Sequence, residues 1–254
     1  MNKTKIDWCD STWNPVTGCL HGCEYCYARG IANRFGGDFT MSRCSEHGFL
    51  ELYGKPENPY PDKFSPTFHR YRLNEYISKK GRNIFVCSMA DLFGDWVPDE
   101  WIKEVFEACE KAPQHNYLFL TKNPIRYELL HQKGILRKCS NMWYGYSATK
   151  DGCDYWFDSQ YNTFVSAEPI LGPIKAYPGK WVIIGAETGR RKNKVIPEKK
   201  WIEDIVNECR KNDIPLFMKS SLANIWGEPL IQEFPRKLKT LVADSEDWSD
   251  CNEK

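Results

Sequence analysis

Short apolar runs that turn polar at their C-terminal ends recur along the chain, with amphipathic segments between them. Their β-branched and aromatic residues predict buried strands. Six such runs cover residues 83–89, 116–122, 142–148, 163–169, 180–187 and 214–220. In residues 97–112 and 196–212, apolar side chains recur at i, i+3, i+4 and i+7, which predicts helices with Cys109 and Cys209 in the core. This alternation predicts an α/β fold, a parallel sheet closed or partly closed into a βα barrel with helices outside it.

The length of 254 residues predicts one large domain, which we place over residues 1–241. The acidic end of the chain, residues 242–254, is predicted to be a flexible tail. The composition is that of an ordinary soluble protein, with 41% apolar and 27% charged residues. A single barrel domain with a short tail is therefore the expected organisation.

One segment, residues 36–82, is too long for an ordinary βα loop and is rich in Gly, Pro and aromatic residues. It forms either a lid over the barrel mouth or a cover for a sheet edge, and the sequence leaves both readings open. Phe68, His69, Tyr71 and Arg72 combine rings and charge in a way that suits a base or a nucleotide.

The expected location is the cytoplasm. No apolar run approaches the roughly 20 residues that a membrane span needs, and the N-terminus lacks the apolar centre of a signal peptide. No membrane partner is therefore expected. In a reducing compartment the eleven cysteines are better suited to metal binding or burial than to disulfides.

The formal net charge of +1 argues against a protein that depends on non-specific contacts with phosphates. Any nucleic-acid surface would have to be local. The basic run at residues 190–194 is either such a surface or a solvated loop.

Polar side chains stand at the C-terminal end of nearly every predicted strand, where chemistry sits in folds of this kind. They either line a pocket or cap the helices that follow, as Asp, Ser and Thr often do. The residues concerned are Ser88, Asp91, Thr121, Lys122, Ser147, Glu168, Glu187, Thr188, Lys219 and Ser220.

Three cysteines, Cys19, Cys23 and Cys26, lie within eight positions of one another. The segment before them reads as a strand or extended arm, and a helix follows that two glycines, Gly36 and Gly37, bring to an end. The thiols therefore sit in a short loop and in the first helical turn, where backbone amides and the helix dipole favour the metal-binding thiolate.

The number of cysteines, three, helps to distinguish between possible metal groups. Iron–sulfur clusters normally take four cysteines, so three leave one iron free to bind something else. A structural zinc with His21 or Cys9 as the fourth ligand is an alternative, although ligation by His21 between two of the cysteines would be cramped. A purely structural role without metal is a further alternative.

The CxxxCxxC spacing, with an aromatic residue (Tyr25) before the third cysteine, resembles the signature of radical S-adenosylmethionine enzymes. The segments TWNPVTGC, FVCSMADLF, PQHNYLFLTKNP, FVSAEPILGPI, WVIIGAETG and PLFMK resemble, in the same order, a phage-associated radical-SAM-like family of unknown function. That family has PGC before its second cysteine where this chain has HGC, a departure that keeps the ligands.

The resemblance implies a four-iron four-sulfur cluster held by Cys19, Cys23 and Cys26, and S-adenosylmethionine bound to the fourth iron. Reductive cleavage of that cofactor to a 5'-deoxyadenosyl radical, and hydrogen abstraction from a substrate, would follow. An electron donor such as flavodoxin or ferredoxin is implied as a partner. Phage association suggests a nucleic-acid base, nucleotide or DNA as substrate, by analogy alone.

By the same resemblance, residues at the strand ends would bind the cofactor. Ser88, Met89, Ala90 and Asp91, at the end of the first run, would hold its amino group. Ser147 and Glu168 would suit its ribose or carboxylate. The glycine-rich turn at residues 185–189 would let the backbone approach its adenine. Lys122 and Lys219 are candidates for the cofactor carboxylate or an anionic substrate. The cofactor-binding set is Tyr25, Ser88, Met89, Ala90, Asp91, Ser147, Glu168, Gly185 and Glu187.

Two classes of function remain open at this stage. The first is a radical enzyme that acts on a base or nucleotide. The second is a non-catalytic iron–sulfur or zinc protein, a sensor or a nucleic-acid-binding module. A polar, open barrel mouth would favour the first class, and a closed, apolar mouth the second.

Overall fold

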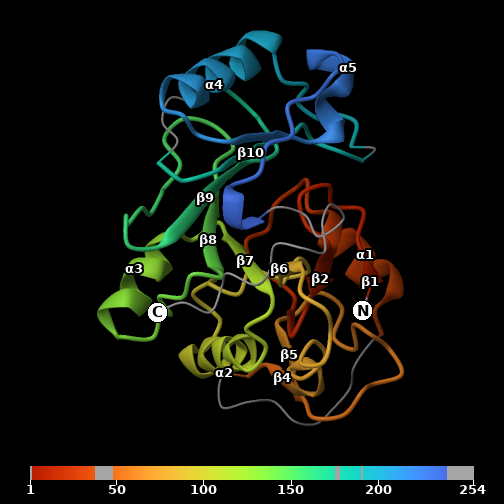
Figure 1. Ribbon diagram of the computed structural model, residues 1–254. Coiled ribbons are helices and arrows are strands. Elements are labelled where there is room, and N and C mark those ends of the chain that lie inside the picture. Colours follow the sequence, from red (N-terminus) through yellow and green to blue (C-terminus); the bar gives the residue numbers. More distant parts are fainter. Residues whose placement is uncertain (1, 38–47, 175–177, 190, 239–254) are drawn as a thin grey trace.

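The six predicted strands are present in the computed structural model, which describes residues 2–37, 48–174, 178–189 and 191–238 (Figure 1). They are β6 (Asn83–Val86), β7 (Asn116–Thr121), β8 (Met142–Ser147), β9 (Asn162–Ala167), β10 (Val182–Ile184) and β11 (Leu216–Met218). The N-terminal strands β1 (Asn2–Lys3) and β2 (Ser11–Trp13) precede them.

The sheet is parallel and curled into a half-barrel (Figure 1). The strands lie in the order β1-β2-β6-β7-β8-β9-β10-β11, and β2 to β11 pair in parallel while β1 adds an antiparallel edge. Every strand from β7 to β11 therefore lies beside the strand before it in the sequence, whereas β6 lies beside β2. The predicted α/β fold with a partial parallel barrel is confirmed.

Helices cover the outer face of this sheet. The two predicted helices are confirmed as α2 (Asp99–Glu110) and α4 (Lys199–Lys211), and α3 (Ile125–Gln132) and α5 (Ala223–Trp226) accompany them. Cys109 and Cys209 are buried in the layers between helices and sheet, as predicted. Among the described residues, every helix is too short or too polar to cross a membrane.

Aromatic side chains fill the inside of the half-barrel. Alternation along the strands turns Phe85, Trp143 and Phe164 inward, and Trp8 packs on Phe85 with ring centroids 4.7 Å apart. Gly145 makes this packing possible, because a Cβ atom there would lie 2.3 Å from the Phe164 ring. These rings fill the inside of the half-barrel below the C-terminal ends of the strands.

The described part of the long segment, residues 36–82, packs beside the N-terminal strand β2, since Phe68 shares a core cluster with Trp13. In its described part, β4 (Leu50–Leu52) and β5 (Thr67–His69) form a small sheet with β3 (Val16–Thr17). Phe68 and His69 are fully buried, and Arg72 donates to the Asn14 carbonyl oxygen at 2.9 Å. These side chains hold the fold together and are not available to stack on a base. Residues 38–47, Arg190 of the basic run, and the predicted tail at residues 242–254 lie outside the described residues.

Burial of His69 predicts a specific acid sensitivity. Burial and the nearby charge of Arg72 lower the pKa of His69 from 6.5 to about 3, while its Nε2 lies 2.8 Å from the Thr17 hydroxyl oxygen. The unfolded chain takes up this proton near pH 6.5 and the folded chain does not, so stability falls as the pH drops from 6.5 toward 3. We expect His69→Gln to reduce the slope of unfolding free energy against pH by about 1.4 kcal/mol per pH unit in this window. Urea unfolding of the wild type and of His69→Gln at several pH values measures the slope of the unfolding free energy against pH. Equal slopes for the two proteins would contradict the expectation.

Candidate functional site

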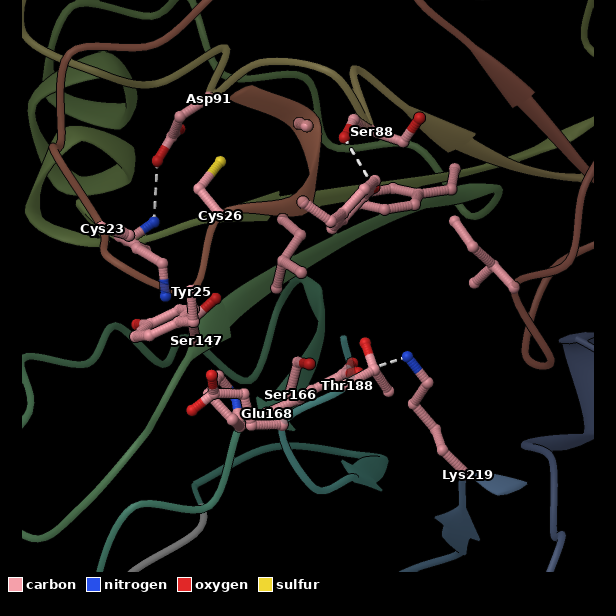
Figure 2. A pocket seen from close by; sticks show the side chains of 18 of the residues that line it. Cys23, Tyr25, Cys26, Ser88, Asp91, Ser147, Ser166, Glu168, Thr188 and Lys219 are labelled. Atoms are coloured by element: carbon pink, nitrogen blue, oxygen red, sulfur yellow. Dashed lines mark hydrogen bonds and ion pairs between the residues drawn. The ribbon is translucent and has the colours of Figure 1, made fainter. Parts of the chain in front are cut away.

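A cavity of about 510 Å³ opens at the C-terminal ends of the parallel strands (Figure 2). Its floor is apolar and includes Trp8, Phe85 and Leu120, and its walls carry polar groups. All ten polar strand-end residues named from the sequence line it. A volume in this range is typical of pockets for small molecules and cofactors.

The cavity brings most of the predicted site residues together. Met89 and Gly185 are not among its lining residues: Met89 packs with Ala28, Ala32 and Phe64 beneath the cysteine loop. The predicted residues that line the cavity are Cys19, Cys23, Tyr25, Cys26, Ser88, Ala90, Asp91, Lys122, Ser147, Glu168, Glu187 and Lys219.

The three cysteines lie on one loop between β3 and α1 (Tyr27–Phe35). The loop turns at Gly18, whose φ is +87°, and a Cβ atom there would lie 2.1 Å from the Ser65 carbonyl oxygen, so this position requires glycine. Cys26 is the N-cap of α1, and its sulfur accepts a hydrogen bond from the Arg29 amide at 3.4 Å. The predicted placement of the thiols in a loop and at a helix start is confirmed.

The apolar side chains of this helix are only partly buried. Ala28 and Ala32 are buried, whereas Ile31 and Phe35 are exposed. The helix therefore rests on the body of the protein through its small side chains. This close seating brings the helix start, and with it Cys26, to the edge of the cavity.

The thiols fit a metal group in number, and all three line the same cavity. Burial, together with the nearby Asp91, Cys26 and Cys23, raises the pKa of Cys19 to about 12. At Cys19 the structure therefore runs against the predicted preference for the thiolate, because burial outweighs the local backbone hydrogen bond. In the described part of the chain, no three His, Cys, Asp or Glu side chains already converge on one point. Metal binding would draw the sulfur atoms together and displace the Cys19 proton.

Tyr25 lies beside Cys23 and Cys26 at the cavity (Figure 2), and Lys122 also lines it. The Lys122 ammonium lies 5.3 Å from the centre of the Tyr25 ring. Burial raises the pKa of the Tyr25 phenol, and the charge of Lys122 opposes that rise. Lys122 thus places a positive charge next to the cysteine loop.

Asp91 is held by four donors. Its Oδ1 accepts from the Phe93 amide at 3.0 Å and the Thr121 hydroxyl at 2.7 Å. Its Oδ2 accepts from the Lys122 amide at 2.8 Å and His21 Nε2 at 2.7 Å. A carboxylate offers about four lone-pair positions, and protein groups occupy all of them here.

The residues before Asp91 contact the same loop. The Ser88 carbonyl oxygen accepts from the Tyr27 hydroxyl at 2.8 Å, and the Met89 carbonyl oxygen accepts from the Gly18 amide at 2.9 Å. The segment at residues 88–91 therefore supports the cysteine loop at several points. Any contact of these residues with a cofactor stays a prediction.

Two ion pairs stand at other strand ends. Lys219, which follows β11, pairs with Glu168, which follows β9, and both side chains are half-buried (Figure 2). Gly185 lies between them, and a Cβ atom there would be 3.1 Å from Lys219 Cδ and 3.2 Å from Glu168 Cδ. A Cβ atom at Gly185 would therefore crowd the pair, which spans β10.

The second pair joins Glu187 to the cysteine loop. Arg191 donates to both carboxylate oxygens of Glu187, at 2.7 and 2.8 Å, and to Glu24 at 3.2 Å. Hydrogen bonding from Arg191 lowers the pKa of Glu187. Glu24 lies between Cys23 and Cys26, so this arginine connects loops more than 160 residues apart.

Several lining residues were not predicted. Ser166 and Tyr27 line the cavity, and Trp8 forms its floor. Ser166 could have been found from the alternation of side chains, since it lies two positions before Glu168 on the same strand face. Trp8 carried no such signal, because its position depends on a distant contact.

The fold and site define a half-barrel α/β protein whose cavity, at the C-terminal ends of the strands, is lined by polar strand-end side chains and three cysteines. The chain belongs to the family described as "Protein of unknown function (DUF5131)", whose profile matches residues 3–245. A search of curated proteins and a search of solved structures each found no match.

Proposed function

We propose that this protein is a radical S-adenosylmethionine enzyme that acts on a nucleic-acid base or nucleotide. The observation that carries the proposal is the position of three cysteines on one loop at the wall of a ligand-sized cavity that polar strand-end side chains also line. Cys19, Cys23 and Cys26 would hold a four-iron four-sulfur cluster. When bound, the cluster would pass one electron, received from a donor such as flavodoxin or ferredoxin, to S-adenosylmethionine and so supply its reductive cleavage.

The chain's own residues would bind and orient the cofactor and substrate. Lys219 and Glu168 offer a cation and an anion side by side, which suits the carboxylate and amino ends of a methionine group. Ser147 and Ser166 offer hydroxyl groups for a ribose. The apolar floor around Trp8 would exclude water from the reacting atoms.

The alternative is a non-catalytic iron–sulfur or zinc protein. Such a protein uses its cysteines to hold the chain together and needs no polar cavity beside them. The cavity and its polar walls therefore favour the enzyme.

Anaerobically purified protein provides the test. We expect about four irons and a matching amount of sulfide per chain. Dithionite and S-adenosylmethionine should then yield 5'-deoxyadenosine, detected by mass. Zinc in place of iron, or a reconstituted cluster that never cleaves the cofactor, would contradict the proposal.

A further inference from the structure

We propose that His21 and Asp91 form a brace that fixes the middle of the cysteine loop, residues 18–26, in the arrangement that receives the cluster. The inference rests on the cluster-binding function proposed above. It assigns Asp91 a positioning role, through the loop, in place of direct contact with the cofactor.

The Asp91 end of the brace is rigid. The side chain is 6% exposed, and the amides of Phe93 and Lys122 and the hydroxyl of Thr121 fix its carboxylate. These donors come from the loop after β6 and from the end of β7, so the carboxylate is tied to the sheet itself. With three lone-pair positions taken by the scaffold, the fourth points to His21.

The His21 end belongs to the loop. Its Nε2 lies 2.7 Å from Asp91 Oδ2, and its ring packs edge-on against Trp96 at 4.8 Å between centroids. The Trp96 indole can occupy this position because residue 94 is glycine: a Cβ atom at Gly94 would lie 2.3 Å from the Trp96 ring. One hydrogen bond and one ring contact together fix both the position and the plane of the imidazole.

The loop needs such an anchor. Gly18 and Gly22 both have positive φ angles, +87° and +73°, and glycine gives the backbone wide freedom. The Gly18 amide and the Tyr27 hydroxyl hold the two ends of the loop on residues 88 and 89. His21 lies halfway between Cys19 and Cys23, where neither end contact reaches, and Leu20 beside it is 53% exposed.

Amide hydrogen exchange of the cluster-free chain tests the brace without relying on activity. We expect His21→Ala to speed exchange in residues 18–26 about tenfold, because a hydrogen bond to a charged group is lost. After reconstitution, the same variant should lose iron to a chelator faster than the wild type. His21→Gln keeps an N–H donor and should restore much of the protection.

His131→Ala is the matched control, since His131 also forms one side-chain hydrogen bond, to Tyr161 at 2.9 Å, and does not line the cavity. It should leave exchange in residues 18–26 unchanged. Unchanged exchange in His21→Ala, with the variant folded, would overturn the brace. A wild-type chain that takes up no iron, while His21→Ala still speeds exchange, would overturn the proposed cluster and leave the brace as a loop anchor.

Discussion

Replacing any one of Cys19, Cys23 and Cys26 by serine is expected to reduce iron from about four atoms per chain to near zero and to abolish 5'-deoxyadenosine formation. Each thiol lies on the same cavity wall and is half-buried, so each would supply one of three ligands. With two thiolates in place of three, two irons of the cluster would lack a protein ligand, and such a cluster is far less stable. Iron and sulfide assays with single-turnover cleavage of S-adenosylmethionine measure both effects.

Cys139 and Cys153 are the matched controls for these three variants. They are also free and half-buried, yet they do not line the cavity. Cys139→Ser and Cys153→Ser should therefore keep full iron content and activity. If a control variant loses iron as completely as Cys23→Ser, the ligand assignment is wrong.

The parts of the fold that could be predicted depend on patterns within short segments. Buried parallel strands read as continuous apolar runs, and each of the six runs formed a strand. The polar residue that ends such a run must then lie at the C-terminal edge of the sheet. For this reason the ten strand-end residues could be named before their mutual positions were known, and all ten line the cavity.

The remaining features depend on contacts between distant residues. Strands β3, β4 and β5 are two or three residues long, too short to give a periodic signal, and pair with segments far along the chain. His21 reaches Asp91 across 70 positions, and Glu168 reaches Lys219 across 51. The residue types were visible in the sequence, but their pairing depends on the register of the sheet.

The ion pair of Lys219 and Glu168 should matter for binding more than for folding. We expect Lys219→Met to weaken binding of S-adenosylmethionine by about 10- to 100-fold, because a charge-assisted hydrogen bond to the ligand carboxylate contributes about 1.5–3 kcal/mol. Glu168→Gln should weaken binding to a similar degree through the amino group. Calorimetry on the reconstituted protein measures both.

Loss of the pair also affects the folded state, so binding and stability must be separated. The side chains of Lys219 and Glu168 are 16% and 23% exposed, and those of Arg126 and Asp99, a pair that does not line the cavity, are 13% and 18% exposed. Arg126→Met should therefore lower the unfolding free energy about as much as Lys219→Met. For both variants we expect a loss of about 1–3 kcal/mol, more than for an exposed ion pair and less than for a fully buried one.

The two variants should then differ in binding alone. Arg126→Met leaves the cavity wall intact and is expected to bind the cofactor as the wild type does. Lys219→Met removes the cation while Gly185 keeps the space open, so the loss of affinity would reflect the missing charge and not a blocked cavity. Equal affinity in the wild type and Lys219→Met would mean that the pair only joins β9 to β11, and that the cofactor carboxylate binds elsewhere, with Lys122 the next residue to test.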